Sequence, residues 1–139
     1  MDDAKRDLVQ AWLIKARNDI DTARQISSLP DGHLDAAIYH CQQAAEKALK
    51  GLLAFHDHEL GRTNDLKRLV RLAVDNNSAF AQWHDAAITL TPYATAYRYP
   101  GESVTLEPSR TEFDEALELA TTFVTFVLSL VPAEVQPNG

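Results

Sequence analysis

Apolar residues recur along the chain with the spacing of amphipathic α-helices, and no stretch alternates as a β-strand would. Between short segments that contain glycine and proline, the pattern predicts helices over residues 3–28, 34–55, 65–75, 78–97 and 109–130. Pro92 lacks an amide hydrogen and clashes with the preceding turn, so a kink or restart is expected at Thr91. Five helices with short connections predict an all-α fold, an antiparallel up-and-down four-helix bundle with an additional short helix.

The first two helices show their buried faces most clearly. In the first helix, one apolar stripe contains Leu8, Trp12, Ala16, Ile20 and Ala23. In the second, the stripe is rich in small side chains and contains Leu34, Ile38, Cys41, Ala45, Ala48 and Leu52. Small side chains allow a neighbouring helix to approach closely, so helix 34–55 is expected at the centre of the bundle. Polar side chains fall on its opposite face, namely Gln43, Glu46, Lys47 and Lys50, with Glu46 and Lys50 paired at i, i+4.

Polar residues at the helix starts predict caps. Thr63 or Asn64 is expected to cap the third helix. Ser109, followed three residues later by Glu112, is a capping box for the last one. Residues 1–132 are expected to form a single helical domain, and residues 133–139 a disordered tail.

Composition narrows the class of protein. The 139 residues are 45% hydrophobic and 24% charged, which is typical of one globular domain and not of a disordered chain. Cys41 is the single cysteine, which excludes an internal disulfide. No apolar run reaches about 18 residues and no signal peptide opens the chain, so a cytoplasmic protein without a membrane span is expected.

The net charge of −7 lies entirely in one half of the chain. Basic and acidic groups balance over residues 1–74, whereas residues 75–139 contain only Arg98 and Arg110 against nine acids. An acidic chain binds the nucleic-acid backbone poorly, because phosphate neutralisation supplies most non-specific affinity. Bulk DNA binding is therefore not expected, although a local basic patch is still able to bind a nucleotide.

Several common kinds of site are not indicated. The five histidines form no pair at the i, i+3 or i+4 spacing of helical metal sites, so neither a metal nor a cofactor is expected. Cys41 lies within an apolar stripe, which indicates a buried thiol rather than a nucleophile. No glycine-rich phosphate loop is present.

The remaining candidate for chemistry is a set of polar and aromatic side chains, Lys47, Lys50, Tyr97, Arg98 and Tyr99. An arginine between two tyrosines has the chemistry to bind a phosphate and to stack on a base. The alternative is that Arg98 pairs with a local acid such as Glu102, while the tyrosines cover the end of the bundle.

Four blocks of sequence resemble the HEPN domain family. Residues 12–20 (WLIKARNDI) resemble its opening helix, and residues 40–53 (HCQQAAEKALKGLL) are similar to its most recognisable stretch. Asn64-Asp65-Leu66 resembles its "HDL" segment, and Tyr97-Arg98-Tyr99-Pro100 its "RYP" segment. The resemblance implies a small helical bundle, typically a homodimer, often encoded beside a small nucleotidyltransferase or fused to one. Many members are metal-independent ribonucleases of toxin or defence systems.

In those ribonucleases, the resemblance implies an active site built across the dimer from an Arg-x4–6-His motif. The arginine stabilises phosphate charge, and the histidine assists attack by the ribose 2′-hydroxyl. Counted from Arg98, the histidine positions are occupied here by Ser103, Val104 and Thr105, none of which is a general base near pH 7. The catalytic motif is broken, so no catalytic residue is assigned.

The sequence thus favours a non-catalytic HEPN subunit. It is expected to form a homodimer and to work with a small nucleotidyltransferase partner in a toxin–antitoxin or defence module. Its candidate nucleotide contacts are Lys47, Lys50, Tyr97, Arg98 and Tyr99. Two alternatives stay open: a ribonuclease for single-stranded RNA with a displaced base, for which His40 and His84 are the candidates, and a structural adaptor that binds no ligand.

Overall fold

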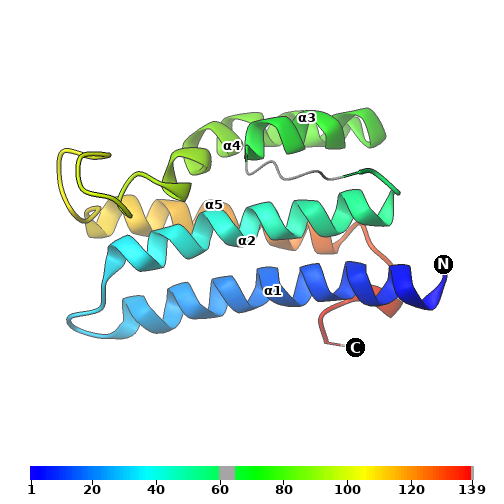
Figure 1. Cartoon of the computed structure of the whole chain (residues 1–139), viewed down its shortest axis with the longest axis horizontal. Helices are drawn as coiled ribbons and strands as arrows, with labels where there is room; N and C mark the ends of the chain where they lie inside the picture. Colours follow the sequence, from blue (N-terminus) through cyan, green and yellow to red (C-terminus); the bar gives the residue numbers. More distant parts are fainter. Residues whose placement is uncertain (60–64, 139) are drawn as a thin grey trace.

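The computed structural model describes residues 1–59 and 65–138, and all regular elements within these residues are helical. The all-α class is therefore confirmed. The α-helices are α1 (Asp3–Ser28), α2 (Leu34–Phe55), α3 (Leu66–Asn76), α4 (His84–Leu90) and α5 (Arg110–Leu128) (Figure 1). The short 3₁₀ helices are η1 (Ser78–Trp83), η2 (Thr91–Ala94) and η3 (Ala133–Val135).

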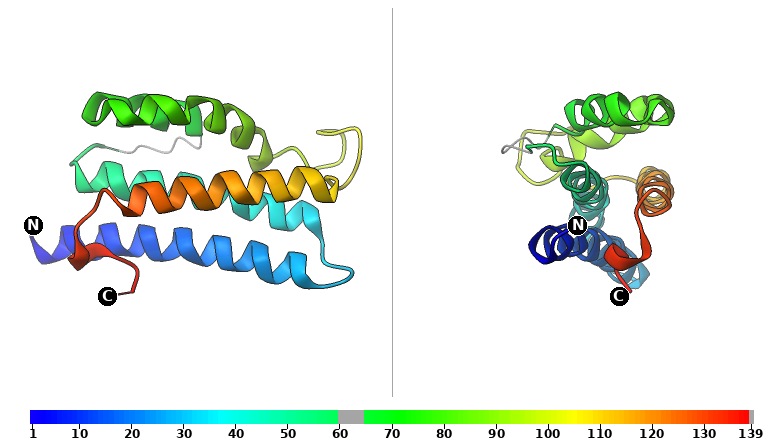
Figure 2. Two further views of the ribbon diagram at one scale, coloured as in Figure 1. Left: turned by 180° about the vertical axis from the view of Figure 1, so that it is seen from behind. Right: turned by 90° about the vertical axis from the view of Figure 1, so that its right-hand side faces the viewer.

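Helix α2 lies at the centre of the bundle, as its alanine-rich stripe predicts. Helices α1 and α2 form an antiparallel hairpin, and α5 lies beside α2 and runs in the same direction (Figure 1). The α3 and α4 segments lie on the side of α2 that faces away from α1, as the end-on view shows (Figure 2). Each long helix of the bundle thus contacts α2.

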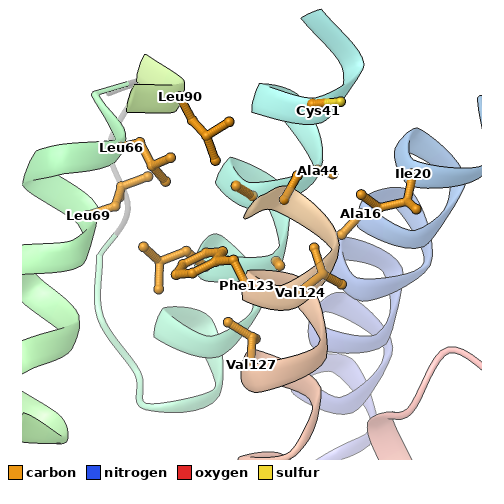
Figure 3. Packing of buried hydrophobic residues seen from close by; sticks show 14 of the residues in the cluster. Ala16, Ile20, Cys41, Ala44, Leu66, Leu69, Leu90, Phe123, Val124 and Val127 are labelled. Atoms are coloured by element: carbon orange, nitrogen blue, oxygen red, sulfur yellow. The ribbon is translucent and has the colours of Figure 1, made fainter. Parts of the chain in front are cut away.

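Small residues let α1 and α2 approach closely. Ala16 and Ala44 are fully buried where the helices meet α5, beside Phe123 and Val124 (Figure 3). At Gly51, an added Cβ atom would lie 2.9 Å from Leu13 Cδ2 and 3.1 Å from Trp12 Cβ, closer than ordinary van der Waals contact. The absence of a side chain at Gly51 therefore sets the distance between the two helices.

The buried face of α1 differs from the predicted stripe in its first half. Ala16, Ile20 and Ala23 are buried as predicted, but Leu8 is 54% exposed and Trp12 is half-buried. Val9 and Leu13, each one position further along, are fully buried in their place. One residue is a rotation of about 100° on a helix, so α1 turns a neighbouring face toward α2.

Most of the predicted helix boundaries are confirmed. The fourth predicted helix is divided into η1, α4 and η2, with the expected restart at Thr91. Ser109 caps α5, because its Oγ accepts a hydrogen bond of 3.1 Å from the Glu112 amide. Asp65 caps α3 through the Lys67 amide. The caps predicted for α3, Thr63 and Asn64, lie outside the described residues.

The C-terminal residues pack against α1, which corrects the expectation of a disordered tail. Val135 in η3 is fully buried. The Gln136 side-chain amide donates to the carbonyl oxygens of Leu128 and Val131, at 2.8 and 3.1 Å, and the backbone carbonyl of Gln136 accepts from the Gln10 side-chain amide at 3.0 Å. Figure 2 shows this segment returning to the side of α1. The buried Val135 and the side-chain hydrogen bonds, including those from Gln10 and Arg17 of α1, supply the order that polar composition did not predict.

None of the helices described here has the length and apolar character that a membrane crossing requires.

Replacement of Gly51 by valine is expected to destabilise the protein by about 1–3 kcal/mol, because the new side chain overpacks against Leu13 and Trp12. Urea unfolding followed by circular dichroism measures the free energy of unfolding. Ala36→Val is the matched control, since Ala36 is exposed on the same helix and bears only the propensity cost of valine, about 0.5 kcal/mol. Equal losses in the two variants would show that Gly51 does not set the helix spacing.

Candidate functional site

The structure divides the five candidate residues between two places. Tyr97, Arg98 and Tyr99 line one cavity of about 200 Å³ at the end of the bundle, together with Asp35 from the first turn of α2. Its other lining residues come from the following loop: Pro100, Gly101, Ser103, Thr105 and Leu106. Lys47 and Lys50 do not line this cavity. We call the cavity the Arg98 pocket.

Glu112 holds the tyrosines beside the Arg98 pocket. Its two carboxylate oxygens accept hydrogen bonds from Tyr97 (2.7 Å) and Tyr93 (2.8 Å), whose rings stack with centroids 6.2 Å apart. The hydrogen bond to Glu112 raises the pKa of Tyr97, and burial together with the same carboxylate raises that of Tyr93. The carboxylate predicted to complete the capping box therefore fixes η2 and the start of the loop onto α5.

Arg98 is available for an anion. Its guanidinium lies over the ring of Tyr39 on α2, with Cζ 3.8 Å from the ring centroid. Within the described residues it has no carboxylate partner, so the pairing with Glu102 considered from the sequence is not formed. A guanidinium stacked on an aromatic face keeps its N–H donors in the ring-parallel plane, where they are able to bind a phosphate.

Lys47 instead belongs to a polar trio between α1 and α2. Asp19 is only 6% exposed, and its carboxylate accepts hydrogen bonds from His40 Nδ1 at 2.7 Å and Lys47 Nζ at 2.8 Å. Burial alone would raise the pKa of Asp19, but the hydrogen bonds from His40 and Lys47 outweigh it and lower the pKa below its ordinary value of 3.8. The trio links α1 to α2, and Lys47 forms its ion pair with Asp19 within the protein.

Lys50 is buried and is likewise paired within the protein. It is 8% exposed, its Nζ lies 3.5 Å from the Glu46 carboxylate, and it lies 5.5 Å from the centroid of the Trp12 ring. Gln42 donates to Glu46 and accepts from Gln43, which extends the chain of polar contacts along α2. The predicted Glu46–Lys50 pair is present, but on a covered face rather than in solvent.

One group of side chains in the described residues brings a histidine nitrogen and two carboxylates close together. His33, Asp35 and Glu107 offer ligand atoms within 4.8 Å of one another, and His33 Nδ1 lies 3.6 Å from Glu107. The sequence pattern does not indicate this group, because Glu107 is far along the chain and the fold brings it to the start of α2. Cys41 is placed as expected: it is fully buried, and burial raises the pKa of its thiol to about 12.

The fold and the site together define a class: an all-α bundle with an arginine pocket at one end. The sequence matches the HEPN domain over residues 9–130, and the chain belongs to this family. The structure is similar to the crystal structure of an archaeal HEPN homologue, with 28% identity and a TM-score of 0.68, over 89% of this chain and 98% of that one. A comparison with curated proteins finds no match.

Replacement of Asp19 by asparagine is expected to lower the free energy of unfolding by about 1–3 kcal/mol at pH 7, because it leaves His40 and Lys47 without their anionic partner. The lowered pKa of Asp19 means that the folded state binds its proton less tightly than the unfolded state. The carboxylate therefore stabilises the protein above about pH 4, and this contribution is lost as the pH falls through the folded-state pKa.

Urea unfolding of both proteins at pH 7 and near pH 3 tests this expectation. The difference in the free energy of unfolding between the wild type and Asp19→Asn should be largest at pH 7 and smaller near pH 3. Asp21→Asn, an exposed position on the same helix, is the control. A difference that does not change with pH would contradict the role assigned to the Asp19 carboxylate.

Proposed function

We propose that this protein is a non-catalytic HEPN subunit that binds a nucleotide in the Arg98 pocket. It acts as a homodimer beside a small nucleotidyltransferase protein, in a toxin–antitoxin or defence module. The observation that carries the nucleotide part is the guanidinium of Arg98, stacked on Tyr39 at 3.8 Å and free of any carboxylate in the described chain.

The lining of the Arg98 pocket supplies each kind of contact that a nucleotide needs. Arg98 binds the phosphate through charge-assisted hydrogen bonds. Tyr99, which is 57% exposed, offers a ring face on which a base stacks. Asp35 lines the same cavity, and a carboxylate accepts hydrogen bonds from ribose hydroxyls. With about 200 Å³, the cavity takes the phosphate and ribose, and the base lies against Tyr99 at its edge.

The residues that follow Arg98 support the non-catalytic part of the proposal. Ser103 lines the pocket, Val104 is fully exposed, and the Thr105 hydroxyl donates to the Glu107 carbonyl at 2.9 Å. None of these groups takes up a proton near pH 7. A pocket with an arginine for the phosphate and no base at residues 103–105 is suited to holding a nucleotide without cleaving it.

A second candidate function, ribonuclease activity with a displaced base, rests on His40. The buried carboxylate of Asp19 orients the imidazole of His40 through Nδ1. This arrangement leaves Nε2 of His40 for proton transfer. His40 follows Tyr39, the residue over which Arg98 stacks. RNA cleavage by Arg98 and His40 requires the scissile phosphate to lie between the Arg98 guanidinium and the His40 imidazole.

Arg98→Ala is expected to weaken nucleotide binding about 10- to 100-fold, because a hydrogen bond to a charged group contributes about 1.5–3 kcal/mol. Isothermal titration calorimetry with ATP and with the three other ribonucleoside triphosphates measures the dissociation constants. Arg68→Ala, which removes an exposed arginine from α3, is the matched control. Equal affinities in both variants would refute the assignment of Arg98, and no binding by the wild type would favour the ligand-free adaptor.

Single-stranded RNA of mixed sequence is expected to stay intact when incubated with the wild-type protein and a chelator. The Arg98→Ala and His40→Ala variants are assayed beside it on denaturing gels. Cleavage that disappears in both variants would overturn the non-catalytic proposal and identify His40 as the base. Cleavage that persists in both variants would indicate a contaminating nuclease, and the non-catalytic proposal would stand.

A further inference from the structure

The surface between α4 and α5 contains a groove that the Arg98 pocket does not include. It has a volume of about 410 Å³ and is lined by Trp83, Thr89, Glu115, Glu118, Leu119 and Thr122. Trp83 ends η1, Thr89 belongs to α4, and the other residues lie along one stripe of α5. We call it the α4–α5 groove.

The floor of the α4–α5 groove is apolar and rigid. The Trp83 ring packs against Phe123 and Phe126, with centroid distances of 5.2 and 5.4 Å. Leu119 is half-buried beside it and is packed against the core. The Trp83 indole nitrogen is buried and has no hydrogen-bond partner in the described residues. A floor of this kind takes up apolar side chains with little loss of conformational freedom in the protein.

The rim of the groove is acidic and unneutralised. Glu115 and Glu118 are exposed, and neither forms an ion pair with another described residue. The neighbouring basic residue Arg110 is already used, because it pairs with Asp114 at 3.5 Å and donates to the Ser27 carbonyl. Two free carboxylates above an apolar floor repel nucleotides and other anions, and attract cations that carry apolar groups.

We infer that the α4–α5 groove binds a basic amphipathic helix of a partner protein. Leucine-type side chains of that helix contact Trp83 and Leu119, while its lysine or arginine side chains pair with Glu115 and Glu118. This is the helix-in-groove mode, in which apolar anchors supply affinity and rim charges supply orientation and specificity. The inference rests on the partner part of the proposed function, and it is independent of nucleotide binding at Arg98.

Two model peptides test the proposal with the full chain. Both are 14-residue amphipathic helices with leucine at the same positions; one carries lysine on its polar face and the other glutamate. Calorimetry at low and at physiological salt measures their dissociation constants. The lysine peptide should bind the wild type, more weakly at the higher salt, and the glutamate peptide should bind at least tenfold more weakly.

Charge reversal on the rim separates this groove from general charge attraction. Glu115→Lys/Glu118→Lys should lower the affinity for the lysine peptide at least tenfold and raise the affinity for the glutamate peptide. The control Asp21→Lys/Asp75→Lys changes the net charge equally at exposed positions on α1 and α3, and should alter affinity less than twofold. Circular dichroism checks that both double variants are folded. Leu119→Ser should lower the affinity for both peptides, because it removes an apolar contact in the floor of the groove.

Three outcomes would overturn the proposal: no binding of the lysine peptide by the wild type, equal loss in both double variants, or equal affinity for both peptides. Analytical ultracentrifugation provides a further check on the occupant. A self-association that Glu115→Lys/Glu118→Lys abolishes would show that a second copy of the chain fills the groove instead. The ATP titration of Arg98→Ala reports on the other site, so the failure of one proposal is distinguishable from the failure of the other.

Discussion

The packing of α2 between α1, α5 and α3 is the constraint on which the rest of this structure depends. A helix contacted by α1, α5 and α3 has little free surface for polar groups, yet α2 carries Gln42, Glu46 and Lys50 at buried positions. A buried charge that lacks a partner costs several kcal/mol, so these side chains must satisfy one another. They do so along the helix itself, because residues four apart lie on the same side of it. Gly51 then allows α1 to cover this polar row closely.

The same constraint decides which cations are left for a ligand. Lys47 is held by Asp19 and Lys50 by Glu46, so the two lysines that the sequence suggested as ligand contacts act as structural ties. The first turns of α2, where Asp35 and Tyr39 lie, reach the loop that carries Arg98. Glu112 fixes the tyrosines before that loop. The pocket is therefore built from one end of the central helix and one anchored segment.

Local signals predicted the helices well, and distant contacts account for what they missed. The first two helices begin and end within a residue of the predicted bounds, because apolar period, caps and turn residues act over a few positions. The rotation of α1 toward Val9 and Leu13, the burial of Val135 and the meeting of His33 with Glu107 depend on partners far along the chain. The role of Glu112 shows the same limit: its place in a capping box was local, whereas its tyrosine partners were not.

The uneven charge of the chain acquires a physical meaning once the two surfaces are placed. In the acidic half, Arg110 is neutralised by Asp114, so among the described residues Arg98 is the one cation there without an acidic partner. Glu115 and Glu118 repel an anion along the α4–α5 groove, whereas the proposed nucleotide finds a cation without an acidic partner at Arg98. A basic helix meets the opposite preference. The Arg98 pocket and the α4–α5 groove share no lining residue, so the two proposed ligands do not compete for the same side chains.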